Sequence, residues 1–298
     1  MLKSQNGDRI FDTINMVLLG IITFIVVYPL YFVLIASISD PDLVNTGKVV
    51  LIPKGITLMG YVRVFQDKEI LTGYRNTIFY AVAGTMINLF MTLTCAYALS
   101  KKRLRGRSFF TIMFAFTMFF SGGLIPTYLL VKSLGMINKI WALIIPNAVS
   151  MYNIVVARTF FSNSVPAEIE ESAMIDGCNT TYTFVKIVLP LSKALISVLA
   201  LFYGVGHWNS FFDALIYITN RNLYPLQLIL REILIQNEMK SAMMEVMADG
   251  DDMVSMQMKI ASMIKYAVII VSSLPVLIVY PFLQKYFAQG IMLGALKG

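Results

Sequence analysis

The sequence predicts an all-α membrane protein, a single domain built as a bundle of six transmembrane helices. Its composition is the first reason, because 57% of the 298 residues are hydrophobic and only 14% are charged, an apolar excess that ordinary soluble domains do not show. Apolar runs of about twenty residues are the second reason, since each can cross a hydrocarbon core of about 30 Å. The third is that basic residues gather at the ends of these runs, so the net charge of +7 reflects topology in a lipid bilayer and indicates no nucleic-acid partner.

Six apolar runs are the predicted spans, in one domain covering residues 1–298. They are residues 14–38, 77–99, 109–131, 141–161, 191–218 and 266–287. Pro29 interrupts the first, Gly122, Gly123 and Pro126 lie within the third, and Pro146 lies within the fourth. A membrane helix tolerates such a proline where neighbouring helices or water satisfy the freed carbonyl group. We therefore expect kinks in the third and fourth spans.

A dense basic loop predicts the orientation of the chain. Residues 101–107 contain five Lys and Arg side chains, and short loops of this kind stay in the cytoplasm. Counting spans from there places both chain ends in the cytoplasm, together with residues 164–190. The segment 219–263 then lies outside, and we expect its residues 226–263 to be mostly helical.

Residues 164–190 are polar between two apolar runs, and they predict two short helices joined by a turn. Pro166 suits the first turn of a helix, and the acidic residues that follow it are favoured near a helix N-terminus. Gly177 stands where a left-handed C-terminal residue is wanted. Asn179 or Thr180 can then cap the second helix.

No catalytic constellation and no metal site stands out in the sequence. There is no phosphate loop, no H-E-x-x-H motif and no paired cysteine or Cys/His spacing for a metal. If transport by this chain uses ATP, another chain must bind the nucleotide.

The segment 164–190 also contains a long motif of fixed spacing. Glu171-Ser172-Ala173 is followed after three residues by Gly177, and after nine more by Ile187-x-Leu189-Pro190. This resembles the E-A-A…G…I-x-L-P motif of the membrane subunits of type I ABC importers, with Ser172 in place of the usual alanine. In that family the motif forms the coupling helix, which docks in a groove of a cytoplasmic ATPase subunit. We call residues 164–190 the coupling element. The resemblance implies a coupling role for Glu168, Glu171, Ser172, Ala173, Asp176, Gly177, Ile187, Leu189 and Pro190.

The resemblance extends over nearly the whole chain. Trp208-Asn209-x-Phe211 followed by a Pro-Leu turn is similar to the sugar-permease branch, which includes the maltose-system permeases. Gly122-Gly123-Leu124-Ile125-Pro126-Thr127 is similar to members that handle oligosaccharides from polysaccharides such as alginate. The resemblance implies the type I importer permease fold in a bacterial cytoplasmic membrane. It implies a second homologous permease, two ATPase subunits that hold ATP and Mg, and an external solute-binding protein, often a lipoprotein. This chain itself would bind no cofactor.

Polar residues within the spans are candidates for the path of the carbohydrate substrate, because such residues are costly in a membrane unless they face partners or water. The candidates, which include an aromatic plane beside hydrogen-bonding groups, are Asn88, Asn153, Trp208, Asn209, Asp213 and Tyr217. Asn147, His207 and Tyr203 lie near them in the predicted spans. The alternative that these side chains only bond neighbouring helices stays open.

Two other classes of protein remain as alternatives to an importer subunit. A self-sufficient secondary transporter would need coupling-ion sites and often shows inverted repeats, and we find no repeat. An integral membrane enzyme would need more than one His and one intramembrane Asp. The external segment 226–263 either contacts the solute-binding protein or partner permease, or packs as a simple helix.

Overall fold

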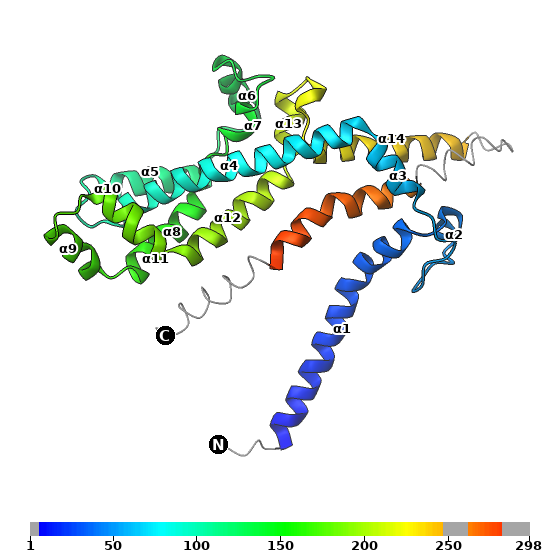
Figure 1. The fold of residues 1–298 in the computed structure, drawn as a ribbon, viewed down its shortest axis with the longest axis horizontal. Coiled ribbons are helices and arrows are strands. Elements are labelled where there is room, and N and C mark those ends of the chain that lie inside the picture. The colour runs from blue at the N-terminus through cyan, green and yellow to red at the C-terminus, as the bar shows by residue number, and fades with distance from the viewer. Residues whose placement is uncertain (1–5, 247–261, 282–298) are drawn as a thin grey trace. The chain divides into compact units, whose positions relative to one another are not determined.

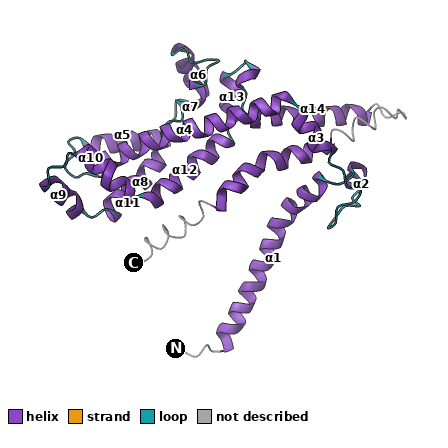
Figure 2. Cartoon of the chain, viewed as in Figure 1, coloured by secondary structure: helices purple, strands orange, loops and turns teal. Residues whose placement is uncertain are grey.

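A computed structural model describes residues 6–246 and 262–281, and within these ranges the chain contains helices and no strand (Figures 1 and 2). The helices are α1 (Asn6–Ser37), α2 (Pro41–Asn45), α3 (Met59–Gln66), α4 (Lys68–Ser100), α5 (Arg107–Phe119), α6 (Leu124–Ser133), α7 (Trp141–Ile144), α8 (Met151–Ser164), α9 (Ala167–Ile175), α10 (Thr180–Thr183), the π-helix η1 (Phe184–Val188), α11 (Leu189–Leu191), α12 (Lys193–Trp208), α13 (Phe212–Tyr217), the 3-10 helix η2 (Arg221–Leu223) and α14 (Leu226–Val246). A further helix covers Ser262–Pro281. The end of the sixth predicted span, 282–287, and residues 247–261 of the predicted external segment lie outside the described residues.

Three described helices are long and apolar enough to cross a membrane: Phe11–Ser37 within α1, the helix α4, and Ser262–Pro281. Two bent pairs raise the number to five if each is one span, namely α5 with α6, and Thr180–Leu191 with α12. The described part of the chain is therefore a multi-pass, all-α membrane protein, and the count of six spans stays a prediction.

Three of the predicted spans are not single helices. In the third, α5 and α6 meet at 117° where Gly123 has a φ of +84°, an angle that favours glycine. The fourth is divided into α7 and α8 around Pro146, which lacks an N–H and disfavours helix in the residue before it. In the fifth, α12 ends at Trp208, and α13 begins four residues later at Phe212. The glycines and prolines of the third and fourth spans predicted kinks there, and the structure shows full breaks. The break in the fifth span was not predicted, because apolar composition runs through it.

The chain divides into two compact units, and the first comprises residues 1–68 with 231–274. Its core includes Ile35 of α1 and Val49 of the loop that follows α2, both buried. The ring of Phe32 meets Tyr266 edge to face at 6.3 Å. A Cβ at Gly60 would lie only 2.7 Å from the backbone carbonyl oxygen of Met263, so a glycine is needed for α3 to approach the helix Ser262–Pro281 this closely.

The second unit comprises residues 69–230 with 275–298, and α4 is its longest helix. The C-terminal half of α4 packs with α8, η1 and α12 around buried Ala96, Ala157, Val188 and Leu199. Small residues at two of these positions let helices approach closely, as is typical in membranes.

The N-terminal half of α4 is held by polar contacts to the turn that precedes α14. Asn76 Nδ2 donates to the carbonyl oxygens of Asn222 and Tyr224 at 2.7 and 3.0 Å. Thr77 Oγ1 accepts from the N–H of Leu226 at 2.8 Å. These bonds satisfy backbone groups that the turn would otherwise leave unpaired.

Candidate functional site

The first helix of the coupling element is α9, and its ends follow from the local sequence. Pro166 lies just before the helix with extended backbone angles, one position earlier than the first turn in which we expected it. Gly177 follows the helix with a φ of +82°, which confirms the predicted left-handed residue. The N–H of Cys178 then donates to the carbonyl of Ala173 at 2.9 Å. No atom lies within 4 Å of a Cβ built on Gly177, so within this chain the glycine is needed for its backbone angle and not for space.

The second helix of the coupling element begins at an asparagine cap. The Asn179 side chain accepts a hydrogen bond from the N–H of Tyr182 at 2.7 Å, which confirms one of the two predicted caps. Helix α10 runs into η1 and α11, and the chain then bends by 82° into α12. The second half of the coupling element is therefore continuous in sequence with the bundle helix that follows it.

The residues of the second helix that are buried are not the residues that belong to the motif. Phe184 and Val188 are buried in the core around α4, whereas Ile187 and Leu189 are half-buried and Pro190 is exposed. The two buried residues lie outside the set that the resemblance implies. They make the deepest contacts with the bundle, and the half-buried Leu189 of the motif packs against the same core.

A buried ion pair joins α9 to the end of α4. Glu170 is only 7% exposed, and its carboxylate binds the ammonium group of Lys101, the first residue of the basic loop. The Lys101 Nζ also lies 4.2 Å from the centre of the Tyr97 ring. That ring stacks on Phe184 of η1 at 4.5 Å. The basic loop and the coupling element therefore lie at the same end of the unit (Figure 1).

Sequence reasoning missed the role of Glu170, because it lies just before the motif and its partner is 69 residues away. The sequence did contain a signal for this ion pair, because the basic loop is dense in positive charge and the coupling element has four acidic residues. Both segments are predicted on the same side of the membrane, so their opposite charges are candidates to pair.

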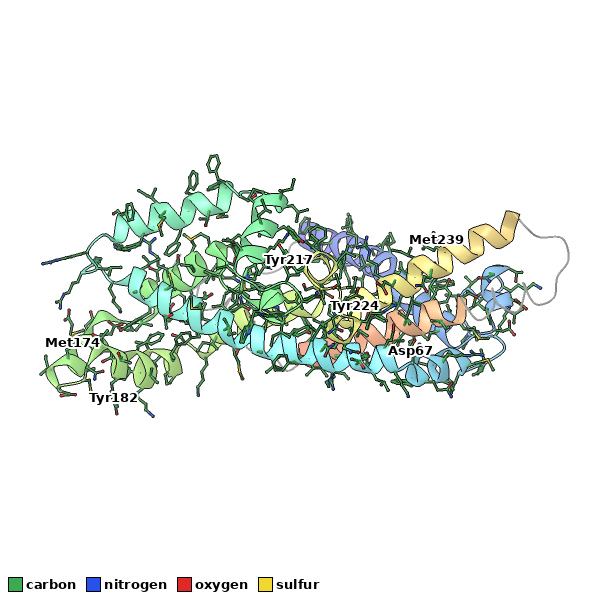
Figure 3. All side chains as sticks on the ribbon, turned by 90° about the horizontal axis from the view of Figure 1, so that it is seen from above. Asp67, Met174, Tyr182, Tyr217, Tyr224 and Met239 are labelled. Atoms are coloured by element: carbon green, nitrogen blue, oxygen red, sulfur yellow. The ribbon has the colours of Figure 1, made fainter. Side chains whose placement is uncertain are left out.

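The outward surface of α9 combines acidic and apolar side chains. Of the residues with an implied coupling role, Ala173 is buried and the exposed ones are Glu168, Glu171, Ser172, Asp176 and Gly177. Ile175 is 86% exposed and Met174 is 44% exposed. Met174 lies at the tip of the unit together with Tyr182 of α10 (Figure 3). Exposed apolar side chains with a charged surround are typical of a surface that contacts another protein.

A separate polar cluster lies between α4 and α12. Asn88, fully buried, donates from Nδ2 to the backbone carbonyl of Asn147 at 2.7 Å. Its Oδ1 lies 2.7 Å from Nε2 of His207. The side chain of Asn147 in turn donates to Asp213 Oδ2 at 2.7 Å. Two of the predicted path residues, Asn88 and Asp213, thus belong to one hydrogen-bonded chain.

The polar cluster forms part of the wall of a cavity of about 340 Å³. Asn147, Asn153 and His207 line it, together with Tyr203 and Ser210. We call this space the polar cavity. Its side chains come from α7, α8, α12 and the turns beside them, so the fold assembles it from distant parts of the sequence.

Of the six predicted path residues, Asn153 alone lines the polar cavity. Asn88 and Asp213 bond to the lining residue Asn147, and the other three lie elsewhere. Trp208 lines an apolar groove on another face of α4 and contacts Tyr74 edge to face at 6.0 Å. Asn209 is exposed at the end of α12. Tyr217 is buried and stacks on Tyr128 at 6.2 Å.

Comparison with known proteins gives strong matches along the whole chain. No model of a known protein family matches the sequence. Protein LplC of Bacillus subtilis (strain 168) is 41% identical over 297 residues, which are 100% of this chain and 98% of LplC. The polygalacturonan/rhamnogalacturonan transport system permease protein YtcP of the same organism is 40% identical over 291 residues, 98% of this chain and 99% of YtcP.

A solved structure also resembles the chain closely. It is a chain in the crystal structure of a bacterial ABC transporter involved in the import of the acidic polysaccharide alginate. The TM-score is 0.85 and the identity is 34%, with 96% of this chain and 100% of that chain covered.

Proposed function

The chain belongs to the permease subunits of carbohydrate ABC importers, and we propose that it forms half of the translocation path of an ATP-driven oligosaccharide importer. It is a non-catalytic, multi-pass membrane subunit, and its partners are the other components of such a transporter. We propose that these are a second homologous permease, two ATPase subunits and an external solute-binding protein. ATP and Mg then bind the ATPase subunits and not this chain.

The coupling element is the part of the chain that we propose receives motion from the ATPase. The observation that carries this proposal is the fixed and exposed position of α9: its Glu170 is buried against Lys101, while Ile175 points to the outside with 86% of its surface exposed. A helix tied to the bundle can transmit a rigid-body movement, whereas a loose loop would absorb it. The acidic and apolar outer face of α9 then fits a groove of the ATPase.

The proposed orientation of the chain in the membrane is supported by the basic loop beside the coupling element. The five basic residues of the loop 101–107 favour the cytoplasmic side of the membrane. The ion pair of Lys101 with Glu170 holds the coupling element beside this loop and supports the same side for it. This supports a location in the bacterial cytoplasmic membrane with both chain ends inside.

The test is Gly177→Trp in the assembled complex of both permeases, the ATPase subunits and the binding protein. A tryptophan at a φ of +82° strains the turn by about 1–2 kcal/mol and adds bulk to the docking face. We expect oligosaccharide uptake and substrate-stimulated ATP hydrolysis both to be lost. Wild-type rates in a correctly assembled complex would show that the docking role is wrong.

Gly135→Trp is the matched control for this experiment. Gly135 also has a positive φ, +64°, and no atom lies within 4 Å of its Cβ position, but it lies in the turn between α6 and α7. We expect this variant to keep its ATP hydrolysis. Co-purification in mild detergent separates the importer from a self-sufficient secondary transporter, because only the importer brings down an ATPase pair.

A further inference from the structure

We propose that the polar cavity binds a neutral, hydroxyl-rich part of the transported sugar, and this inference rests on the proposed carbohydrate transport. The cavity of about 340 Å³ is large enough for a sugar ring. Its wall combines amide, hydroxyl and imidazole groups with an aromatic ring. Sugars bind proteins through hydroxyl hydrogen bonds and through the apolar face of the ring, which packs on aromatic side chains.

The depth of the polar cavity fits a translocation path. At a rise of about 1.5 Å per residue, Asn88 lies about 18 Å along α4 from its end at Ser100. A hydrocarbon core of about 30 Å has its midplane at a similar depth from either surface. Polar groups at this depth are costly, so they are expected to face a partner or a water-filled cavity.

The hydrogen bonds of Asn88 determine which groups the cavity wall offers. The Asn147 carbonyl only accepts hydrogen bonds, so the Asn88 atom 2.7 Å from it is the amide nitrogen. The other amide atom, an oxygen, must therefore accept from His207 Nε2. A neutral His207 with its proton on Nε2 has a lone pair at Nδ1 that can accept from a hydroxyl group.

Gly84 leaves the space on α4 that the His207 ring occupies. A Cβ at Gly84 would overlap the imidazole, with the His207 Cδ2 at only 2.8 Å. The ring thus packs directly on the backbone of α4, in hydrogen-bond reach of Asn88. Such a fixed wall is preorganised for binding and loses little freedom when a ligand enters.

The aromatic surface comes from α12. Phe202 lines the polar cavity and is 47% exposed, so part of its ring surface can contact a ligand. Asn153 of α8 and Ser210 also line the cavity. This places hydrogen-bonding side chains and an aromatic ring around one space, as sugar recognition requires.

The charges around the polar cavity select against an acidic group. No Lys or Arg is among the described residues that line it. The carboxylate of Asp213 is hydrogen-bonded to the lining residue Asn147. A sugar carboxylate would meet no cation here and would be repelled by Asp213, so this subunit contacts the hydroxyl groups of the substrate.

The experiment compares two probes, galactotriose and trigalacturonate, which differ by a carboxylate on each ring. The complete transporter is reconstituted in vesicles, and sugar uptake and ATP hydrolysis are measured together. Asn153→Ala removes one hydrogen-bonding group, so uptake per ATP of each transported probe should fall about fivefold. ATP hydrolysis should stay at the wild-type rate. Ser197→Ala is the control, because Ser197 lies on the same helix as His207, bonds only the Lys193 carbonyl of its own helix among the described residues and does not line the cavity.

A second variant tests the charge preference. Ser150 lines the polar cavity, and its side chain makes no cap hydrogen bond to α8. Ser150→Lys therefore adds a cation to the cavity without removing a cap hydrogen bond. We expect the uptake ratio of trigalacturonate to galactotriose to rise about fivefold or more. An unchanged ratio, or wild-type uptake per ATP in Asn153→Ala, overturns the inference. A wild-type complex that transports neither probe instead contradicts the proposed oligosaccharide transport.

Discussion

The coupling element and the polar cavity are built in opposite ways. The coupling element is one continuous segment, and its distinctive side chains are exposed at the tip of the unit (Figure 3). The polar cavity gathers side chains from α7, α8, α12 and the turns beside them, and Asn88 of α4, which bonds the lining residues Asn147 and His207, is fully buried. A surface that docks to a partner can be encoded locally, because the partner supplies the other half. The polar cavity depends on how the helices of this chain pack, so its residues come from distant positions.

This comparison predicts two kinds of functional defect. A change in the coupling element should reduce ATP hydrolysis and transport together, because the ATPase no longer receives or sends motion. A change in the polar cavity should reduce transport alone. Four sets of substitutions test the distinction.

The largest effect is expected for Glu170→Lys, which places two ammonium groups side by side where the structure has an ion pair. Breaking a mostly buried pair costs about 2–3 kcal/mol, and the like charges push α9 away from α4. Uptake and substrate-stimulated ATP hydrolysis should both fall about tenfold or more. Rates are compared at equal amounts of assembled complex.

The charge swap provides the control for this pair. Lys101→Glu combined with Glu170→Lys restores opposite charges at the same two positions. We expect it to recover part of both activities. A double variant as inactive as Glu170→Lys, with normal assembly, would show that the ion pair does not position α9.

A smaller effect, confined to transport, is expected for Gly84→Ala. The added methyl group overlaps the His207 ring, and such overpacking costs about 1–3 kcal/mol. The bond between His207 and Asn88 should break, and uptake per ATP should fall about fivefold. Gly204→Ala is the control in α12, since its Cβ would meet only Thr85 Oγ1 at an ordinary 3.7 Å. Equal losses of uptake and ATP hydrolysis in Gly84→Ala would remove the distinction between the two regions.

Asn179→Ala tests a finer feature of the coupling element. It removes the hydrogen bond from the Tyr182 N–H, and losing such a cap costs about 1 kcal/mol. We expect stimulated ATP hydrolysis to fall by a factor of about two to five. Asn179→Asp, which can accept the same bond, should keep the wild-type rate. If alanine and aspartate behave alike, the cap does not matter for coupling.

The smallest effect is expected for Tyr97→Phe. The Tyr97 hydroxyl is buried and makes no hydrogen bond within the described part of the chain, while its ring carries the contacts to Lys101 and Phe184. Phenylalanine keeps that ring, so the thermal stability of the complex and both activities should stay unchanged. Tyr97→Leu removes the stacked ring and should lower the melting temperature. A clear loss in Tyr97→Phe would reveal a partner for the hydroxyl group.

The two regions also explain what the sequence could predict. The helices of the coupling element, the left-handed Gly177 and the cap at Asn179 follow from residues close together in the chain, and the structure confirms them. The family and the helical membrane fold follow from the motif and the apolar runs. Such features depend on local backbone chemistry and on composition.

The remaining features depend on how distant segments meet. The ion pair of Glu170 and the contact of His207 with Asn88 join residues 69 and 119 positions apart. The break near Pro146 was predicted only as a kink, because the apolar residues on both sides give no sign of a loop. Which side of a helix faces a cavity is decided by packing, so Trp208 and Asn209 were included with Asn153 although they do not line the cavity.

The π-helix η1 sits between the cap at Asn179 and the bend at Ser192. A π turn has one more residue than an α turn, so it changes the angular phase of the helix at that point. Removing one residue between Phe184 and Val188 would turn the preceding segment by about 100° about the helix axis. The outer face of α9 would then be aimed in a different direction, although no residue of α9 had changed. The extra residue in η1 therefore sets the direction, about the helix axis, in which the outer face of α9 points.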